Sequence, residues 1–280
     1  MSYVCVTCGV QYPEADTPPE NCPVCQDDRQ YIGRQGQKWI SFDDLRNTHR
    51  NVFFLEDENL WGIQTQPEFA IGQRALLLKT KQGGFLWDCV SVVDASTVEL
   101  VNALGGLKAI AVSHPHYYSS MVEWSRAFGG VPIYLHEDDR EWVQFRDPAI
   151  TFWTGDTHHL GDDLTLIRVG GHFKGFQVLH WASGDQGSGA LMTGDMPQVC
   201  PDRRHVSFMY SYPNFIPVNG ATVRDIVRKL ERYKFAKLYG AWPKFKVAGD
   251  AKLAVRRSAE RYLRAIGDNA PLEIEQSSAA

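Results

Sequence analysis

Four of the six cysteines lie in the first 25 residues, as two C-x-x-C pairs separated by thirteen residues. Each pair can occupy a tight turn whose backbone amides point at the sulfurs, and two such turns facing each other form a tetrahedral site of four thiolates. The surrounding segment is rich in Cys, Pro, Gly and polar residues, so we expect it to need a metal ion in order to fold. The predicted ligands are Cys5, Cys8, Cys22 and Cys25.

This cysteine spacing resembles the rubredoxin-like domain of rubrerythrins, and also zinc ribbons, over about the first 35 residues. One position that is usually glycine in such domains is Gln26 here. The resemblance implies one bound ion, either Zn²⁺ in a structural site or iron in an electron carrier, because four thiolates accept both. We therefore predict a rubredoxin-like or zinc-ribbon domain over residues 1–38 and a larger domain over residues 39–280.

The larger region alternates short apolar segments with turn residues and helical patterns. Short apolar or alternating runs predict strands at residues 51–56, 75–80, 84–90, 107–114, 131–136, 189–196 and 234–240, and two strands within 164–182. Helical spacing predicts helices at residues 96–106, 119–130, 221–233 and 251–267. This order is typical of an α/β domain whose site is built from loops, and it favours two packed sheets with helices outside them.

Composition excludes some classes of partner. The 280 residues carry a formal net charge of −4, which gives no reason to expect nucleic acid or an anionic membrane as partner. No apolar run approaches the roughly 18 to 20 residues of a membrane span, and the start of the chain lacks a signal-peptide pattern. We therefore expect a cytoplasmic protein that acts on a small molecule.

Three of the nine histidines occur in contexts that favour metal binding. His114 and His116 come at the end of a predicted strand, and residues two apart leaving a strand project to the same side. His172 lies in a turn flanked by glycines, which permit close approach of the backbone. Asp195 also follows a predicted strand, where a carboxylate can join imidazoles at a divalent cation. These four residues are the predicted ligands of the larger domain.

The sequence H-x-H, then G-G-H, then G-D, each after a strand, resembles the metallo-β-lactamase fold superfamily over most of residues 50–280. The segment 86–89, Leu-Trp-Asp-Cys, resembles the early superfamily strand that ends in Asp. The resemblance implies a four-layer αββα sandwich. It also implies a complete first metal site, formed by His114, His116 and His172.

The same resemblance implies that the second metal site of the superfamily is mostly lost. Tyr118 and Ser119 stand where the superfamily has an Asp and a His. Trp242 stands at the expected position of its last His, so that only Asp195 remains of the second ligand set. We therefore predict one ion, Zn²⁺ or iron, in the larger domain.

Three functions are compatible with such a site. The first is hydrolysis of an ester, thioester, amide or lactone-type bond by a metal-activated water. In that mechanism Asp195 orients the water and Tyr118 donates a proton or a hydrogen bond to the developing anion. The predicted substrate pocket is lined by Tyr117, Ser119, Phe173, Trp242 and Lys244.

The second function is that of a non-haem iron oxidoreductase or oxygenase, for which an iron-loaded cysteine domain is the electron-transfer module. The third is a pseudoenzyme that binds metal without catalysis. The iron alternative implies a redox partner, and a homo-oligomer also stays open. The sequence favours hydrolysis and leaves the substrate unidentified.

Overall fold

The structure is a computed structural model that describes residues 1–161 and 163–272. Contacts between residues divide the chain into two compact units, Met1–Trp153 and Thr154–Ala280. The predicted domain boundary after residue 38 lies inside the first unit and stays a prediction. None of the described helices combines the length and the apolar character that a bilayer crossing requires.

A two-stranded sheet opens the first unit. Strand β1 pairs with strand β2 in antiparallel fashion, with Cys5 opposite Trp39. This pairing closes the first forty or so residues, including both cysteine pairs, into one folded segment. The elements are β1 (Tyr3–Cys5), α1 (Pro23–Gln26), β2 (Trp39–Ser41) and α2 (Phe42–Thr48).

A seven-stranded sheet with the order β3-β4-β5-β6-β7-β8-β9 forms the rest of the first unit. Its first four strands are an antiparallel meander, in which β3, β5 and β6 were predicted and β4 was not, and β6 to β9 are parallel neighbours. The strands are β3 (Arg50–Asp57), β4 (Leu60–Gln66), β5 (Arg74–Thr80), β6 (Gly83–Trp87), β7 (Leu107–Ala111), β8 (Ile133–His136) and β9 (Ile150–Trp153). Connecting the parallel strands are α3 (Ala95–Ala103), η1 (Pro115–Tyr117), α4 (Met121–Ala127) and η2 (Glu137–Trp142). Because Trp87 pairs with Ala111, the residues that follow β6 and β7 share one edge of the sheet.

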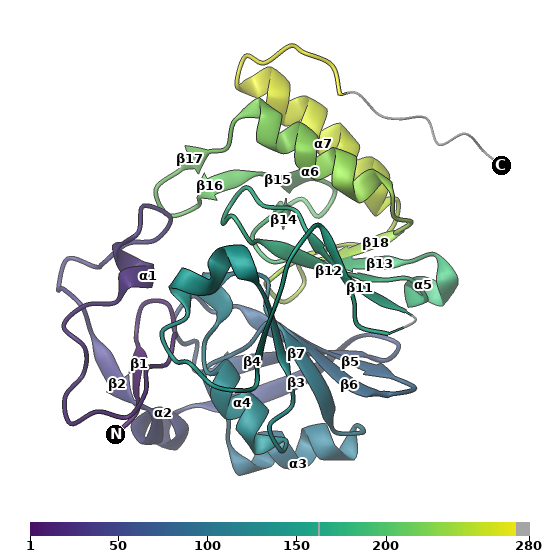
Figure 1. Cartoon of the computed structure of the whole chain (residues 1–280). Helices are drawn as coiled ribbons and strands as arrows, with labels where there is room; N and C mark the ends of the chain where they lie inside the picture. The colour runs from purple at the N-terminus through teal and green to yellow at the C-terminus, as the bar shows by residue number, and fades with distance from the viewer. Residues whose placement is uncertain (162, 273–280) are drawn as a thin grey trace. The chain divides into compact units, whose positions relative to one another are not determined.

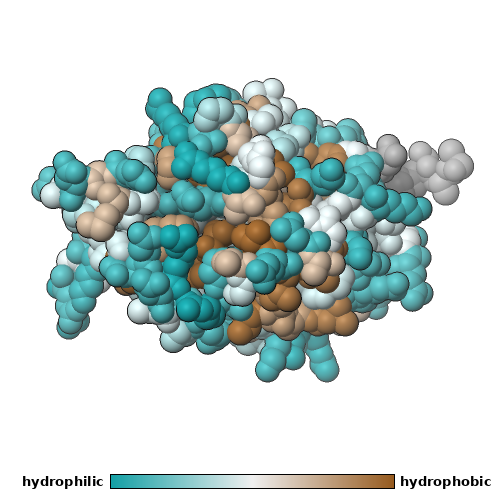
Figure 2. All heavy atoms as spheres, turned by 90° about the horizontal axis from the view of Figure 1, so that it is seen from below, coloured by the Kyte–Doolittle hydropathy of each residue, from teal (hydrophilic) through white to brown (hydrophobic). Residues whose placement is uncertain are grey.

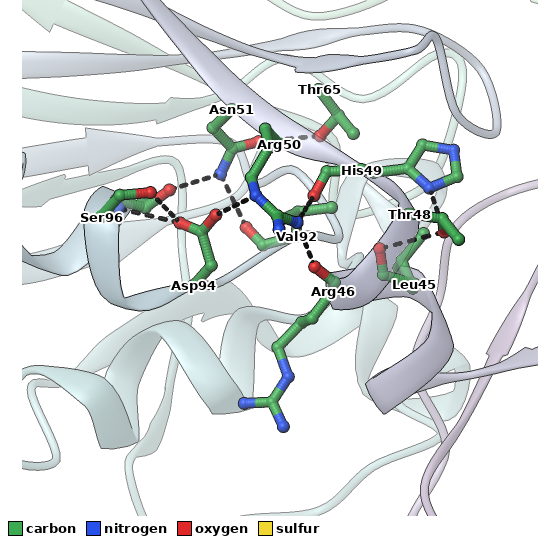
Figure 3. A network of polar contacts seen from close by, with 11 residues as sticks. Leu45, Arg46, Thr48, His49, Arg50, Asn51, Thr65, Val92, Asp94 and Ser96 are labelled. Carbon is green, nitrogen blue, oxygen red and sulfur yellow. Dashed lines mark hydrogen bonds and ion pairs between the residues drawn. The ribbon is translucent and has the colours of Figure 1, made fainter.

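A polar network ties the start of α3 to β3 (Figure 3). Asp94 caps α3 by accepting a hydrogen bond from the Thr97 amide at 2.8 Å, and the Arg50 guanidinium lies 3.8 Å from the Asp94 carboxylate. Asn51 donates to the Val92 carbonyl at 2.9 Å. Burial acts to raise the pKa of Asp94, but hydrogen bonds from Thr97 and Ser96 and the charge of Arg50 together lower it. Asp94 is therefore a charged cap at neutral pH.

The second unit contains a six-stranded sheet with the order β10-β11-β12-β13-β18-β19, in which only β13 and β18 are paired in parallel. Its strands are β10 (Thr157–His159), β11 (Leu164–Arg168), β12 (Gln177–Trp181), β13 (Ala190–Met192), β18 (Lys237–Tyr239) and β19 (Lys246–Val247). Two short antiparallel pairs are β14 (Gln198–Val199) with β15 (Val206–Ser207), and β16 (Met209–Ser211) with β17 (Ile216–Pro217). The helices are α5 (Gly184–Gly187), α6 (Gly220–Glu231) and α7 (Ala251–Ala265).

Helices α6 and α7 pack side by side in this unit (Figure 1). Each presents apolar residues at helical spacing to the interior, such as Val223, Ile226 and Leu230 of α6, while Arg228 of α6 and Arg257 of α7 are exposed. Figure 2 shows apolar side chains gathered in the middle of the face seen from below. Exposed apolar residues of the first unit include Leu55 and Leu100, and single exposures of this kind assign no function.

Candidate metal centres

The four predicted cysteine ligands form a buried cluster in the first unit. The Sγ atoms of Cys5 and Cys25 are 3.6 Å apart, and those of Cys8 and Cys22 are 3.7 Å apart. Four sulfurs at about 2.3 Å from a tetrahedral ion stand roughly 3.8 Å from one another. The cluster therefore has the dimensions of a site for one Zn²⁺ or iron ion.

Backbone hydrogen bonds shape the first cysteine turn. The Gly9 amide donates to the Cys5 carbonyl at 2.8 Å, and Gly9 has a φ of +79°, a region that favours glycine. The Gln37 amide group donates to the Cys5 sulfur at 3.2 Å. Hydrogen bonding to the Cys22 thiol lowers the pKa of Cys5, whereas burial raises the pKa of Cys8. A bound cation is what allows all four sulfurs to be thiolates together.

His114 and His116 follow β7 on a loop that is held by a buried carboxylate. Asp88 Oδ1 accepts a hydrogen bond from the Ser113 amide at 2.7 Å. The Ser113 hydroxyl lies 2.8 Å from His114 Nδ1 and so orients that ring. The ring centroids of His114 and His116 are 5.1 Å apart, and both side chains are buried. Two imidazoles on one tetrahedral ion have centroids roughly 5 Å apart, so the pair is spaced as two ligands of one ion.

Tyr118 and Ser119, the next residues of this loop, are buried and hydrogen-bonded within the first unit. The Tyr118 hydroxyl donates to the Asp139 carbonyl at 3.5 Å. Burial, reinforced by the charge of Asp139, raises the pKa of Tyr118, which keeps the phenol protonated. The Ser119 hydroxyl donates to the Cys89 carbonyl at 3.2 Å. Neither side chain supplies the carboxylate or imidazole that the superfamily pattern has at these positions.

His172 and Asp195 lie close together in the second unit. Gly170 and Gly171, with φ of +70° and +88°, form the turn before His172. The Met209 carbonyl lies 3.2 Å from His172 Nδ1, and because a carbonyl only accepts, Nδ1 carries the proton and Nε2 is the nitrogen that could ligate a metal ion. His172 Nε2 is 3.7 Å from Asp195 Oδ2. Two ligands at about 2.0–2.2 Å from one tetrahedral ion stand roughly 3.3–3.6 Å apart, so this spacing suits a shared ion.

Asp195 and Trp242 occupy equivalent places after neighbouring parallel strands. Met192 of β13 pairs with Tyr239 of β18, and Asp195 and Trp242 each come three residues later. The superfamily resemblance assigns a second-site ligand to the position of Trp242. An indole N–H is only a donor, so this position supplies no metal ligand beside Asp195.

The predicted pocket residues differ in exposure. Tyr117 and Phe173 are buried, with ring centroids 4.3 Å from His114 and 5.2 Å from His172 respectively. Trp242 is partly exposed and Lys244 is exposed, both in the turn after β18. Contact of these side chains, or of Ser119, with a substrate stays a prediction.

Two groups that hold His172 and Asp195 in place were not predicted from the sequence. One belongs to strand β16 and the other to the residue that follows it. The carbonyl of Met209 bonds the His172 ring, and the Tyr212 hydroxyl donates to the Asp195 carbonyl at 2.9 Å. Every residue type has a backbone carbonyl, so the identity of Met209 could not indicate that it bonds the His172 ring. Tyr212 belongs to an aromatic-rich stretch, but its sequence position does not point to Asp195.

The chain has the fold of the metallo-β-lactamases, which confirms the predicted fold class. The DIM-1 metallo-β-lactamase superposes with a TM-score of 0.57 at 16% identity, covering 76% of this chain and 98% of that one. The structure of VMB-1 gives 0.58 at 13% identity, covering 78% and 98%. FIM-1 from Pseudomonas aeruginosa in its mono-zinc form gives 0.54 at 14% identity, covering 75% and 95%. At these identities the similarity establishes the fold alone.

Within this fold class the chain belongs to the family of the uncharacterized protein YmaE of Bacillus subtilis (strain 168). The two sequences are 48% identical over 266 residues, which cover 94% of this chain and 96% of YmaE. No protein-family model matches the sequence. The buried imidazoles and carboxylate form a donor set that can hold a metal ion, and the four-cysteine cluster forms another.

Proposed function

We propose that the chain is a metal-dependent hydrolase with a single catalytic ion on His114, His116 and His172. Asp195 is the fourth protein ligand or the group that orients the water. The observation that carries the proposal is that each unit presents a pair of donors spaced for one ion, 5.1 Å between the two rings and 3.7 Å between His172 and Asp195. Three imidazoles and a carboxylate form a donor set suited to Zn²⁺.

The ion, when bound, lowers the pKa of a water molecule and polarises the bond to be cleaved. The protein residues then divide the remaining tasks. Asp195 accepts a hydrogen bond from the water and directs it at the carbonyl carbon of an ester, thioester, amide or lactone. Tyr118, whose pKa is raised by burial, keeps its proton and acts as a hydrogen-bond donor to the developing oxyanion. To do so it must exchange the Asp139 carbonyl for the substrate oxygen.

Zinc is the metal we propose for the histidine site, supported by the mono-zinc form of FIM-1, which has the same fold. The alternative is a non-haem iron oxidoreductase or oxygenase that receives electrons from a rubredoxin-like N-terminal domain. One contact supports this alternative, because it joins the cysteine segment to the loop of the histidine pair. The backbone amide of Gln11, near the cysteine cluster, donates a hydrogen bond to the Ser119 carbonyl, near the histidine pair. In either case we propose a small-molecule substrate, a cytoplasmic location and no nucleic-acid or membrane partner.

Metal analysis of the purified chain tests the proposal. We expect two equivalents of zinc for the wild type and one for His114→Ala or His172→Ala, with hydrolysis of a member of an ester, thioester, amide and lactone panel lost in both variants. Cys8→Ala should lose the other equivalent. The matched control is His159→Ala, which removes an exposed imidazole on β10 and should keep both ions. Two equivalents in His114→Ala would contradict the histidine assignment, and iron at both sites would favour the oxidative alternative.

A further inference from the structure

The first cysteine turn docks directly on the loop that carries His114 and His116. The Gln11 amide donates to the Ser119 carbonyl at 3.0 Å, and the Ser91 hydroxyl donates to the Gly9 carbonyl at 2.8 Å. The Gln11 side chain also donates to Glu123 in α4 at 3.3 Å. Gly9, Gln11, Ser91 and Ser119 are all buried. Segments about a hundred residues apart in the sequence are therefore joined by hydrogen bonds that water does not compete for.

The contact at Gly9 leaves no room for a side chain. A Cβ on Gly9 would lie 2.6 Å from the Ser91 hydroxyl and 3.2 Å from the Ala70 methyl group. Gly36 in the same segment has nearly the same φ, +78° against +79°, but has open space around it. Replacing Gly36 by alanine therefore tests the effect of the positive φ alone. Replacing Gly9 by alanine tests the positive φ together with the close contact to Ser91.

Ser119 is fixed from both sides at this contact. Its carbonyl accepts from the cysteine turn, while its hydroxyl donates to the Cys89 carbonyl and accepts from Gln73 Nε2 at 3.1 Å. Gln73 bonds the same Cys89 carbonyl at 3.1 Å. Ser119 has a φ of +42°, which is rare for a residue with a side chain and persists only when neighbours hold it. His116 lies three residues earlier, so what fixes Ser119 also fixes the path of the backbone at His116.

We propose that metal bound at the four cysteines positions the histidine loop through Gly9 and Gln11, so that loading the cysteine site raises the metal affinity of the histidine site. The segment around the cysteines has few aliphatic residues, so the free energy of metal binding is what folds it and creates the docking surface. By linkage the coupling is reciprocal, and couplings between sites are typically about 5- to 150-fold in affinity. This inference rests on the proposed histidine site.

Zinc titration of the metal-free full chain against a chromophoric chelator gives the first test. We expect the affinity of the histidine site to fall by about 5- to 150-fold in Cys8→Ser. A smaller fall in the same direction is expected for Ser91→Ala, which leaves every metal ligand in place. Gly9→Ala should weaken the site and Gly36→Ala should not. The control Ser96→Ala removes a serine hydroxyl at the start of α3, bonded to Asp94, and should change nothing.

Hydrogen exchange gives a second test that does not need the histidine site. In a His114→Ala, His116→Ala double variant, adding zinc should slow amide exchange at residues 89–91 and 117–121 and leave β4 and β5 unchanged. A general stabilisation of the unit would instead slow exchange across the whole sheet and would overturn the proposal. So would unchanged histidine-site affinity in Cys8→Ser and Ser91→Ala. If the wild type binds one equivalent of zinc, the proposed function fails, and exchange at 117–121 still decides the coupling.

Discussion

The carboxylate of Asp88 is the group on which the histidine loop depends most directly. It is 1% exposed, accepts from the Ser113 amide at 2.7 Å, and sits at φ +60°, where non-glycine residues other than Asn and Asp are disfavoured. Its own amide donates to the Ala111 carbonyl at 2.9 Å, so Asp88 joins the ends of β6 and β7. Replacing it tests whether the loop is positioned by this one side chain.

Three substitutions separate the two roles of Asp88. Asp88→Asn keeps a carbonyl acceptor and tolerates the left-handed backbone, so its cost in unfolding free energy should be below about 1 kcal/mol. Asp88→Gly keeps the backbone but removes the acceptor for a buried amide, which costs about 1–3 kcal/mol. Asp88→Ala removes the same acceptor and also places a Cβ-bearing residue in the left-handed region, which adds about 1–2 kcal/mol of backbone strain. The expected order of stability is therefore wild type, Asn, Gly, Ala.

Denaturant unfolding of the metal-free protein measures this order, and zinc titration measures its effect on the histidine site. Loss of a group that orients a metal-bound imidazole typically costs 10- to 100-fold in metal affinity. We expect that loss for Asp88→Gly and Asp88→Ala, because the Ser113 hydroxyl no longer holds His114 in place. The reasoning is refuted if Asp88→Gly is as stable as Asp88→Asn, or if both bind zinc equally well.

Three further predictions concern other contacts of the first unit. Ser119→His with Tyr118→Asp, which restores the superfamily residues, should add no third equivalent of metal and should lower stability, as metal analysis and denaturant unfolding will show. The buried Arg74–Glu56 ion pair should make Glu56→Ala cost about 3–5 kcal/mol in unfolding free energy, and Glu56→Gln less. Asp94→Ala should lose about 0.5–2 kcal/mol at pH 7, whereas Asp94→Asn keeps the cap. Because the folded-state pKa of Asp94 lies below 3.8, the stability from its charge is present above that pH and is lost as the pH falls further, so wild type and Asp94→Asn should converge in acid unfolding curves.

Much of the fold could be predicted because local patterns and tertiary packing agree. The predicted strand 51–56 is β3, and the predicted helix 251–267 is α7 apart from its last two residues. Strand β4 was missed, since its segment from Leu60 to Gln66 mixes polar and apolar residues and is defined by pairing with β3 and β5. Pairing partners distant in sequence leave no local signal.

The candidate ligands could be predicted because metal chemistry restricts them to a few residue types at strand ends. Their supports could not, since a backbone carbonyl such as that of Met209 can belong to any residue. Nor did the sequence indicate that residues 9–11 dock against the histidine loop. That contact depends on Gly9 fitting beside Ser91, and shape complementarity is a property of the folded surfaces.

The residues that replace the superfamily's second-site histidines, Ser119 in the first unit and Trp242 in the second, supply no metal ligand. In the first unit, the Ser119 side chain is buried and its hydroxyl bonds the Cys89 carbonyl and Gln73, so an imidazole ring at this position would have to displace both contacts. In the second unit, the indole of Trp242 follows β18 where a ligand would follow it in the superfamily. We therefore expect that restoring ligand identity alone does not restore the site, because the space at position 119 is already bounded by the Cys89 carbonyl and Gln73. The proposed hydrolase therefore uses one ion, and we assign to Asp195 and Tyr118 the tasks that a second ion has in the superfamily.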